Sequence, residues 1–197
     1  MKGDKILMSI IDSIAKRRSI YQLNKNLPVS DSEVEALIKK AAELVPDAFN
    51  MKSARVVAAM GEKHNALWDA IYDAFGGKVS REKINGFRSA YGTVLYYYDA
   101  DTVKALQEKF PAYAANFPVW ANQANGMLQF TVWTVLRELE IGANIQHYNP
   151  VIDEAVRRLF DLPESWVLVA QMPFGGIGLN PEPKDAENIN IRVKIQR

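Results

Sequence analysis

Apolar residues near the start of the chain recur at helical spacing and form one stripe: Ile6, Leu7, Ile10, Ile11 and Ile14. The stripe predicts an amphipathic helix with Lys16, Arg17 and Arg18 in its last turn. Cations there interact favourably with the free carbonyl groups of a helix end, so these residues have an ordinary structural explanation. Together with Ser19 they could instead hold an anion through the guanidinium groups. The local pattern leaves both explanations open.

Helices and strands alternate along the next 150 residues. Ser30 and Glu33 have the spacing of a capping box, which predicts the start of a helix that ends at Pro46. Another helix contains the apolar residues of 67–75 and ends at two glycines. Shorter helices are expected at about 101–110 and 153–160. Runs rich in apolar, aromatic and β-branched residues predict strands at 53–60, 91–99 and 166–175.

The segment from about Val119 to Glu140 is apolar on most of its circumference. Such a helix belongs in the middle of a core or in a subunit interface. Strands separated by helices favour a single α+β or α/β domain over residues 1–197. The polar tail from Gly176 is expected to be disordered or held by a neighbouring subunit. Within it, residues 189–195 alternate apolar and polar side chains and could form an edge strand.

Composition is typical of a soluble globular protein, with 48% hydrophobic and 24% charged residues in 197. A formal net charge of +1 gives no strong field for nucleic acid or an anionic membrane, so neither is an expected partner. The chain has no cysteine, which excludes disulfides and thiolate chemistry. No signal peptide or membrane span is predicted, and a cytoplasmic location is expected.

Side-chain chemistry offers no obvious catalyst. The only histidines, His64 and His147, are far apart, so no metal site is expected, and His64 is interpreted as a surface residue. No serine lies in a G-x-S-x-G motif. The glycines of "GGIG" (175–178) precede prolines rather than a helix, so they are interpreted as a flexible connection and not a nucleotide loop. These absences suggest that an organic cofactor supplies the chemistry.

Six segments together resemble the FMN-dependent nitroreductase family, and most closely its branch named for the fungal fatty-acid-repression-mutant proteins. They are "RRSIYQL" (17–23), "ELVPDAFNMKSARVV" (43–57), "YGTVLYYYD" (91–99), "FPVWANQANGMLQFTVWT" (117–134), "IGANIQHYNPVID" (141–153) and "LPESWVLVAQMPFG" (162–175). The resemblance implies an α+β fold of three layers, α/β/α, with a mostly antiparallel central sheet. It also implies a homodimer in which a C-terminal strand or the tail is exchanged.

The resemblance assigns cofactor-binding roles to four parts of the chain. Arg17, Arg18 and Ser19 would bind the phosphate and ribityl chain of FMN, with Tyr21 along the same flavin edge; paired N–H donors of arginine suit phosphate oxygens. The C-terminal basic pair, Arg192 and Lys194, would also reach the phosphate. Contacts to the flavin ring from the partner subunit would come from Pro46, Asp47, Ala48 and Asn50. The loop passing flavin N5, mostly through backbone groups, would comprise Gln146, His147, Tyr148 and Asn149.

Two positions depart from the family pattern. Asp47 stands where the family usually has serine, and Lys52 where it usually has glutamine. Their opposite charges could form an ion pair. Looser alignment suggests that other polar residues approach the ring: Lys83, Asn85, Asn122, Gln123 and Asn125.

The implied function is an FMN-dependent NAD(P)H oxidoreductase. It would reduce nitroaromatics, quinones or similar acceptors by ping-pong hydride transfer through flavin N5, with no catalytic side chain. No motif separates NADH from NADPH as the donor. The alternative is a non-enzymatic or regulatory flavin-binding protein with the same fold, which the two departures at positions 47 and 52 would favour.

Overall fold

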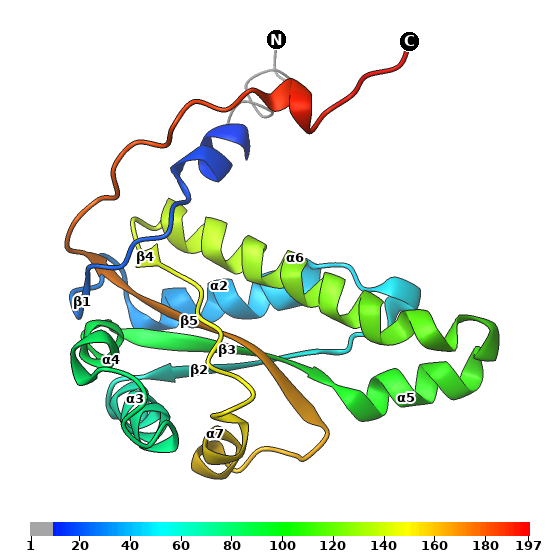
Figure 1. Ribbon diagram of the computed structural model, residues 1–197, viewed down its shortest axis with the longest axis horizontal. Helices are drawn as coiled ribbons and strands as arrows, with labels where there is room; N and C mark the ends of the chain where they lie inside the picture. Colours follow the sequence, from blue (N-terminus) through cyan, green and yellow to red (C-terminus); the bar gives the residue numbers. More distant parts are fainter. Residues whose placement is uncertain (1–9) are drawn as a thin grey trace.

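An antiparallel sheet of five strands forms the centre of the computed structural model, which describes residues 10–197 (Figure 1). The strands are β1 (Leu23–Asn24), β2 (Ala54–Met60), β3 (Gly92–Asp99), β4 (Gly142–Ala143) and β5 (Trp166–Ile177). Their order is β1-β5-β3-β2, and β4 also pairs with β5. The three long strands lie where the sequence predicted them.

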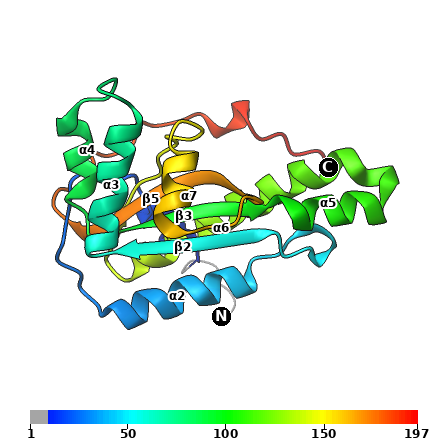
Figure 2. The ribbon, with the colours of Figure 1, turned by 90° about the horizontal axis from the view of Figure 1, so that it is seen from below.

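Helices cover both faces of the sheet and make three layers (Figures 1 and 2). One face carries α2 (Asp31–Leu44) and α6 (Phe117–Glu138). The other carries α3 (Glu62–Ala74), α4 (Arg81–Arg88) and α7 (Asp153–Phe160). Helix α5 (Ala100–Lys109) and the start of α6 extend beyond the end of the sheet. The α+β prediction is therefore confirmed, whereas α4, a two-turn helix, was not predicted.

Strand β3 shows why this region is so rich in apolar and aromatic residues. Val94 and Tyr96 pack in the cluster under α2 and α6, while Leu95 and Tyr97 pack under α3 and α7. Successive side chains point to opposite faces of a strand, so a strand covered on both faces needs apolar residues throughout. A register shift at Tyr96/Tyr97 interrupts the ladder with β5, and the buried amide of Asn125 donates to the Tyr97 carbonyl at 2.9 Å.

Helix α2 begins with the predicted capping box. The Ser30 hydroxyl accepts from the Glu33 amide, and the Ser30 amide donates to Glu33 Oε2 at 3.0 Å. These two bonds satisfy amide groups that have no partner within a helix. Val45 caps the other end in an extended conformation, as expected before Pro46.

The glycines of residues 175–178 are an ordered strand end and not a flexible connection, so that interpretation was wrong. Gly175 and Gly176 pair with β4 and β1 respectively. A Cβ atom on Gly175 would lie 2.4 Å from the Asn24 carbonyl oxygen, and one on Gly176 would lie 2.2 Å from that of Asn26. Only glycine allows the backbone of β1 to approach this closely.

The two ends of the described chain leave the sheet on the same side (Figure 1). Residues 10–16 are helical and the helix ends before Arg17, so Arg17 and Arg18 do not lie in its last turn as predicted; Ile6 and Leu7 lie outside the described residues. The tail forms a 3₁₀ turn, η3 (Ile189–Ile191), and not the edge strand considered for residues 189–195. Large apolar side chains are exposed on both ends: Ile10, Ile11, Ile189, Ile191, Val193 and Ile195. No helix in the described part of the chain is long and apolar enough to cross a membrane.

Candidate functional site

The segment from Arg17 to Tyr21 is fixed to the sheet by β4. The Ile20 amide donates to the Ala143 carbonyl at 3.0 Å, and the buried Asn144 amide donates back to the Ile20 carbonyl at 2.8 Å. This anchoring gathers Arg17, Arg18, Ser19 and Tyr21 around one hollow of about 400 Å³, which Pro181 and Lys184 of the tail complete. Three cations and a hydroxyl therefore share this hollow, which we call the basic hollow.

Arg17 has no anionic partner among residues 10–197, and it is the cation of the basic hollow with a buried donor that lacks an acceptor. Its guanidinium lies over the Trp133 ring at 4.2 Å from the centroid, and its Nε is buried without an acceptor. Burial lowers the pKa of Arg17 from its usual value, and the charge of Arg18 lowers it further. Arg18 donates to the Glu182 carbonyl at 2.8 Å. A buried N–H without an acceptor is costly, so an anion at Arg17 would be favourable.

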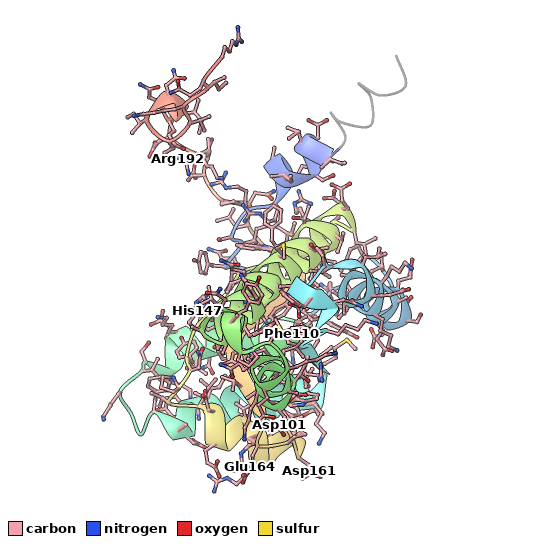
Figure 3. All side chains as sticks on the ribbon, turned by 90° about the vertical axis from the view of Figure 1, so that its right-hand side faces the viewer. Asp101, Phe110, His147, Asp161, Glu164 and Arg192 are labelled. Atoms are coloured by element: carbon pink, nitrogen blue, oxygen red, sulfur yellow. The ribbon has the colours of Figure 1, made fainter. Side chains whose placement is uncertain are left out.

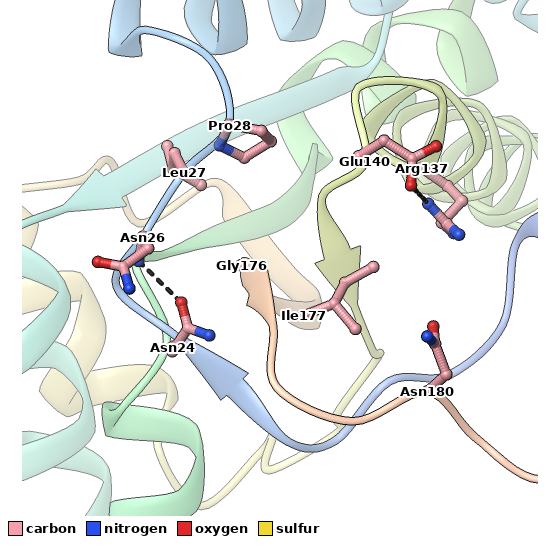
Figure 4. A pocket seen from close by; sticks show the side chains of 9 residues that line it. All are labelled: Asn24, Asn26, Leu27, Pro28, Arg137, Glu140, Gly176, Ile177 and Asn180. Carbon is pink, nitrogen blue, oxygen red and sulfur yellow. Dashed lines mark hydrogen bonds and ion pairs between the residues drawn. The ribbon is translucent and has the colours of Figure 1, made fainter.

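A second hollow, beside β1, shows the contrast. It has a volume of about 510 Å³ and is lined by Asn24, Asn26, Leu27, Pro28, Arg137, Glu140, Gly176, Ile177 and Asn180 (Figure 4). Its one arginine, Arg137, donates to Glu140 at 2.6 Å. The charge of this arginine is neutralised within the chain, so this hollow lacks the free cation that the basic hollow has.

Tyr21 joins the basic hollow to a third one of about 600 Å³, which we call the ring hollow. Ile145 and Gln146 form one wall of it, and the other residues come from α4 and its start: Ser80, Glu82, Lys83, Gly86 and Phe87. Gln146 also donates to Asn144 at 2.7 Å, so the buried Asn144 links both hollows. The two together suit an elongated occupant with an anionic group at one end.

One buried glutamine of β5 holds the loop of residues 146–149. Gln171 exchanges two backbone hydrogen bonds with Gln146, its side-chain oxygen accepts from the Tyr148 amide at 2.8 Å, and its amide donates to Asn149. The Tyr148 ring packs edge-on against Trp68 and faces the core. Of the four predicted loop residues, Gln146 lines the ring hollow, and His147 has an exposed side chain.

The segment after α2 lies apart from both hollows in the single chain, and Pro46, Asp47, Ala48 and Asn50 line neither. Asp47 Oδ2 accepts from the backbone amide of Ser53 at 2.8 Å and from the hydroxyl of Ser53 at 2.7 Å. Asp47 and Lys52 form no ion pair within 4.0 Å, so that hypothesis was wrong; the hydroxyl of Ser53 takes the place of the cation. The 3₁₀ turn η1 (Ala48–Asn50) has positive φ at Phe49 and Asn50.

The predicted C-terminal basic pair lies away from Arg17 within the chain. Arg192 donates to Glu187 of its own tail at 2.9 Å, and both Arg192 and Lys194 are exposed. Figure 3 shows Arg192 on the projecting tail, far from His147. The structure of one chain thus brings together Arg17, Arg18 and Ser19, predicted for the phosphate and ribityl chain, with Tyr21, predicted for the flavin edge, and leaves these two outside.

His64 is completely buried, so its interpretation as a surface residue was wrong. Its Nε2 lies 3.3 Å from the Arg88 carbonyl, which can only accept, so Nε2 carries the proton. Its Nδ1 lies 3.0 Å from the Thr93 hydroxyl, whose oxygen already accepts from Trp68. Burial lowers the pKa of His64 to about 4. The charged neighbours at its helix start concealed this inward orientation.

Sequence reasoning missed several residues of the site. Lys184 lines the basic hollow but lies in a polar, proline-containing tail that carries no motif. Trp133 was noted only as part of an apolar helix, and Asn144 was not singled out, although both contact the Arg17–Tyr21 segment. Lys83 does line the ring hollow, whereas Asn122 donates to Pro118 of its own helix. Within residues 10–197, no group of three or more histidine, aspartate and glutamate residues could hold a metal ion.

Comparisons with known proteins agree on one family. A sequence profile described as the Nitroreductase family matches residues 14–176. The chain is 34% identical over 186 residues to nitroreductase FRM2 of Saccharomyces cerevisiae, covering 93% of this chain and 95% of that protein. It is 31% identical over 177 residues to the yeast putative nitroreductase HBN1, covering 88% and 91% respectively. These matches confirm the predicted resemblance and its fungal branch.

Solved structures give the same result. Nitroreductase CinD from Lactococcus lactis in complex with chloramphenicol superposes with a TM-score of 0.91 at 40% identity, over 95% of this chain and all of that chain. The same protein in complex with 4-nitrophenol gives a TM-score of 0.87 at 39% identity, with the same coverage of both chains.

Proposed function

The chain belongs to the nitroreductase family of oxidoreductases, and from this we propose that it is an FMN-dependent NAD(P)H oxidoreductase that reduces nitroaromatics, quinones or similar acceptors. We further propose that it acts as a cytoplasmic homodimer by a ping-pong scheme. The homodimer would place the segment around Asp47 and Asn50 of each chain against the flavin held by the other.

The observation that carries this proposal is the state of Arg17. A guanidinium with a buried, unpaired Nε and no carboxylate partner in residues 10–197 fits a phosphate group, which accepts two parallel N–H bonds. Arg18, Ser19 and Lys184 would complete the phosphate contacts in the basic hollow. Tyr21 would lie along the ribityl chain, and Gln146 and Lys83 would border the ring.

When bound, FMN supplies hydride acceptance and donation, which no side chain of this protein offers. The protein's own part is to bind and orient. Arg17 and its neighbours neutralise the anionic end, and the loop of residues 146–149, held by Gln171, forms a fixed wall for the ring. Orientation of the reacting groups by fixed walls is itself a large contribution to rate.

The acceptor class is supported by relatives. CinD, at about 40% identity, has been crystallised with chloramphenicol and with 4-nitrophenol, both of which carry a nitro group on an aromatic ring. The exposed Phe49, which lies next to Asn50 and stacks on Trp120 at 5.6 Å between centroids, would offer such a ring an aromatic surface in the dimer.

Purification and steady-state kinetics test the proposal. We expect a yellow protein that contains stoichiometric FMN and oxidises NADH or NADPH when a nitroaromatic acceptor is added. Double-reciprocal plots over a grid of both substrates should be parallel, because donor and acceptor would use the same cleft in turn. Intersecting lines would exclude the ping-pong scheme, and failure to bind FMN supplied in excess would exclude the proposed function.

The alternative of a non-enzymatic flavin-binding protein loses its main support. It depended on charges at positions 47 and 52 next to the ring, whereas the identity of 34% to nitroreductase FRM2 and of 40% to nitroreductase CinD favours an enzyme. Flavin binding without measurable turnover for either nicotinamide donor would revive it.

A further inference from the structure

We propose that Trp133 is a positioning residue of the basic hollow: it holds the Arg17 guanidinium in place while leaving its N–H donors free for an anion. The proposal rests on the proposed function, because it takes the anion to be the phosphate of FMN.

Trp133 contacts Arg17 directly and also the carbonyl group to which Ile20 is bonded. Its ring lies under the Arg17 guanidinium, with 4.2 Å between Cζ and the ring centroid, and Phe130 adds a second ring at 5.6 Å. Its indole N–H donates to the Ala143 carbonyl at 3.1 Å, the same oxygen that accepts from the Ile20 amide at 3.0 Å. One side chain of α6 therefore supports the guanidinium and the backbone anchor of this segment.

Other arginines that lie over aromatic rings show what is different here. Arg81 lies over Tyr72 at 3.8 Å but also donates to Asp69 at 3.3 Å. Arg55 lies over Trp166 at 5.9 Å and forms an ion pair with Asp99 at 2.8 Å. In both cases a carboxylate neutralises the charge, whereas among residues 10–197 no carboxylate does so for Arg17.

This difference matters for binding an anion. A carboxylate beside Arg17 would occupy its donors and repel a phosphate, so an incoming anion would have to displace it. The face of an indole ring attracts a cation through its quadrupole and uses none of the N–H donors. Trp133 can thus stabilise a partly buried cation that must stay available, which the unpaired Nε of Arg17 shows it to be.

Comparison of FMN with riboflavin, which lacks the phosphate, isolates this role. Each flavin is titrated into flavin-free protein, and the ratio of the two dissociation constants measures the phosphate contribution. In Trp133→Leu we expect FMN to bind about three- to tenfold more weakly with riboflavin affinity unchanged, the range of a single cation–π contact. Trp133→Phe keeps an aromatic ring and should retain most of the wild-type preference for FMN over riboflavin.

Tyr72→Leu is the matched control, because it removes the ring under Arg81 and should leave the ratio at the wild-type value. Should Trp133→Leu fail to fold, tetrafluorotryptophan at position 133 keeps the shape and the N–H while removing the negative ring face, and it should lower the ratio likewise. Equal weakening of FMN and riboflavin, or an unchanged FMN affinity, would overturn the proposal. Wild-type protein that binds no FMN would instead overturn the proposed function on which it rests.

Discussion

At the scale of single residues, the burial of Arg17 and His64 has consequences that can be measured. Arg17 has its Nε buried without an acceptor, and His64 is completely buried in its neutral form. The cost at Arg17 would be recovered when a phosphate binds, whereas the cost at His64 appears as a dependence of stability on pH.

Arg17→Ala should weaken FMN binding about ten- to a hundredfold, since a hydrogen bond to a charged group contributes about 1.5–3 kcal/mol. Equilibrium titration of the flavin-free protein measures the change. Arg137→Ala is the matched control, because Arg137 is neutralised by Glu140 in the separate hollow of Figure 4. Equal losses in the two variants would show that Arg17 has no special role.

His64 should make the protein less stable as the pH falls from about 6.5 to 4. Its pKa is lowered to about 4 in the folded state, so between these values the unfolded chain takes up a proton that the folded chain does not. The full contribution of neutral His64 to the free energy of unfolding is therefore present above pH 6.5. Near pH 4 the free energy of unfolding has fallen by about 3 kcal/mol.

Urea unfolding at a series of pH values measures this effect. His64→Gln can still accept from Thr93 and donate to Arg88, so it should fold and give a flatter profile over this range. The control His147→Gln changes the exposed histidine and should keep the wild-type slope. Profiles of the same slope for wild type and His64→Gln would contradict the assignment.

At the scale of elements, β5 holds the loop of residues 146–149 beside the ring hollow through the side-chain amide of Gln171. Gln171→Met should lower the free energy of unfolding by about 1–3 kcal/mol, because it leaves the buried Tyr148 amide without its acceptor. It should also speed hydrogen exchange at that amide. Gln107→Met serves as the control, since that side chain donates only to Ala114 near the surface. Unchanged exchange at Tyr148 would mean that Gln171 does not hold the loop.

Elements with strong local signals could be predicted from the sequence. The capping box at Ser30 was sufficient to predict a helix start, and the aromatic run of β3 was sufficient to predict a strand, because each pattern depends on neighbours in the chain. Helix α4 was missed because only Ile84 and Phe87 are buried in its two turns. The strand considered for residues 189–195 depended on alternation alone, and the part of the chain that the structure describes has no strand there to pair with it.

The residues of the candidate site fall into the same two groups, those with a local signal in the sequence and those without one. The gathering of Arg17, Arg18, Ser19 and Tyr21 followed from one contiguous motif. The side chains that hold this motif, Trp133 and Asn144, come from more than a hundred residues away, so their contacts depend on the packing of α6 and β4. Contacts of this kind are set by tertiary structure and leave no local pattern.

At the scale of the whole molecule, the projecting chain ends support the proposed homodimer. We expect the wild type to sediment as a dimer at micromolar concentration. A chain ending at Ala186 lacks the exposed Ile191 and Ile195 and the predicted basic pair, Arg192 and Lys194, so it should dissociate and lose FMN. Val151→Asp changes another exposed apolar residue away from the tail and should remain dimeric. A flavin-loaded monomer in the wild type would contradict the prediction.

Arg192 and Lys194 do not line the hollow that contains Arg17 of the same chain, and this has a genetic consequence if the tail serves the other subunit. An allele carrying Arg17→Ala would damage the site that its own product forms, whereas an allele carrying Arg192→Ala and Lys194→Ala, which keeps the apolar residues of the tail, would damage the site of its partner. Two such inactive alleles expressed together would form heterodimers with one intact and one doubly defective site. They would therefore complement each other, whereas two alleles of the same kind would not.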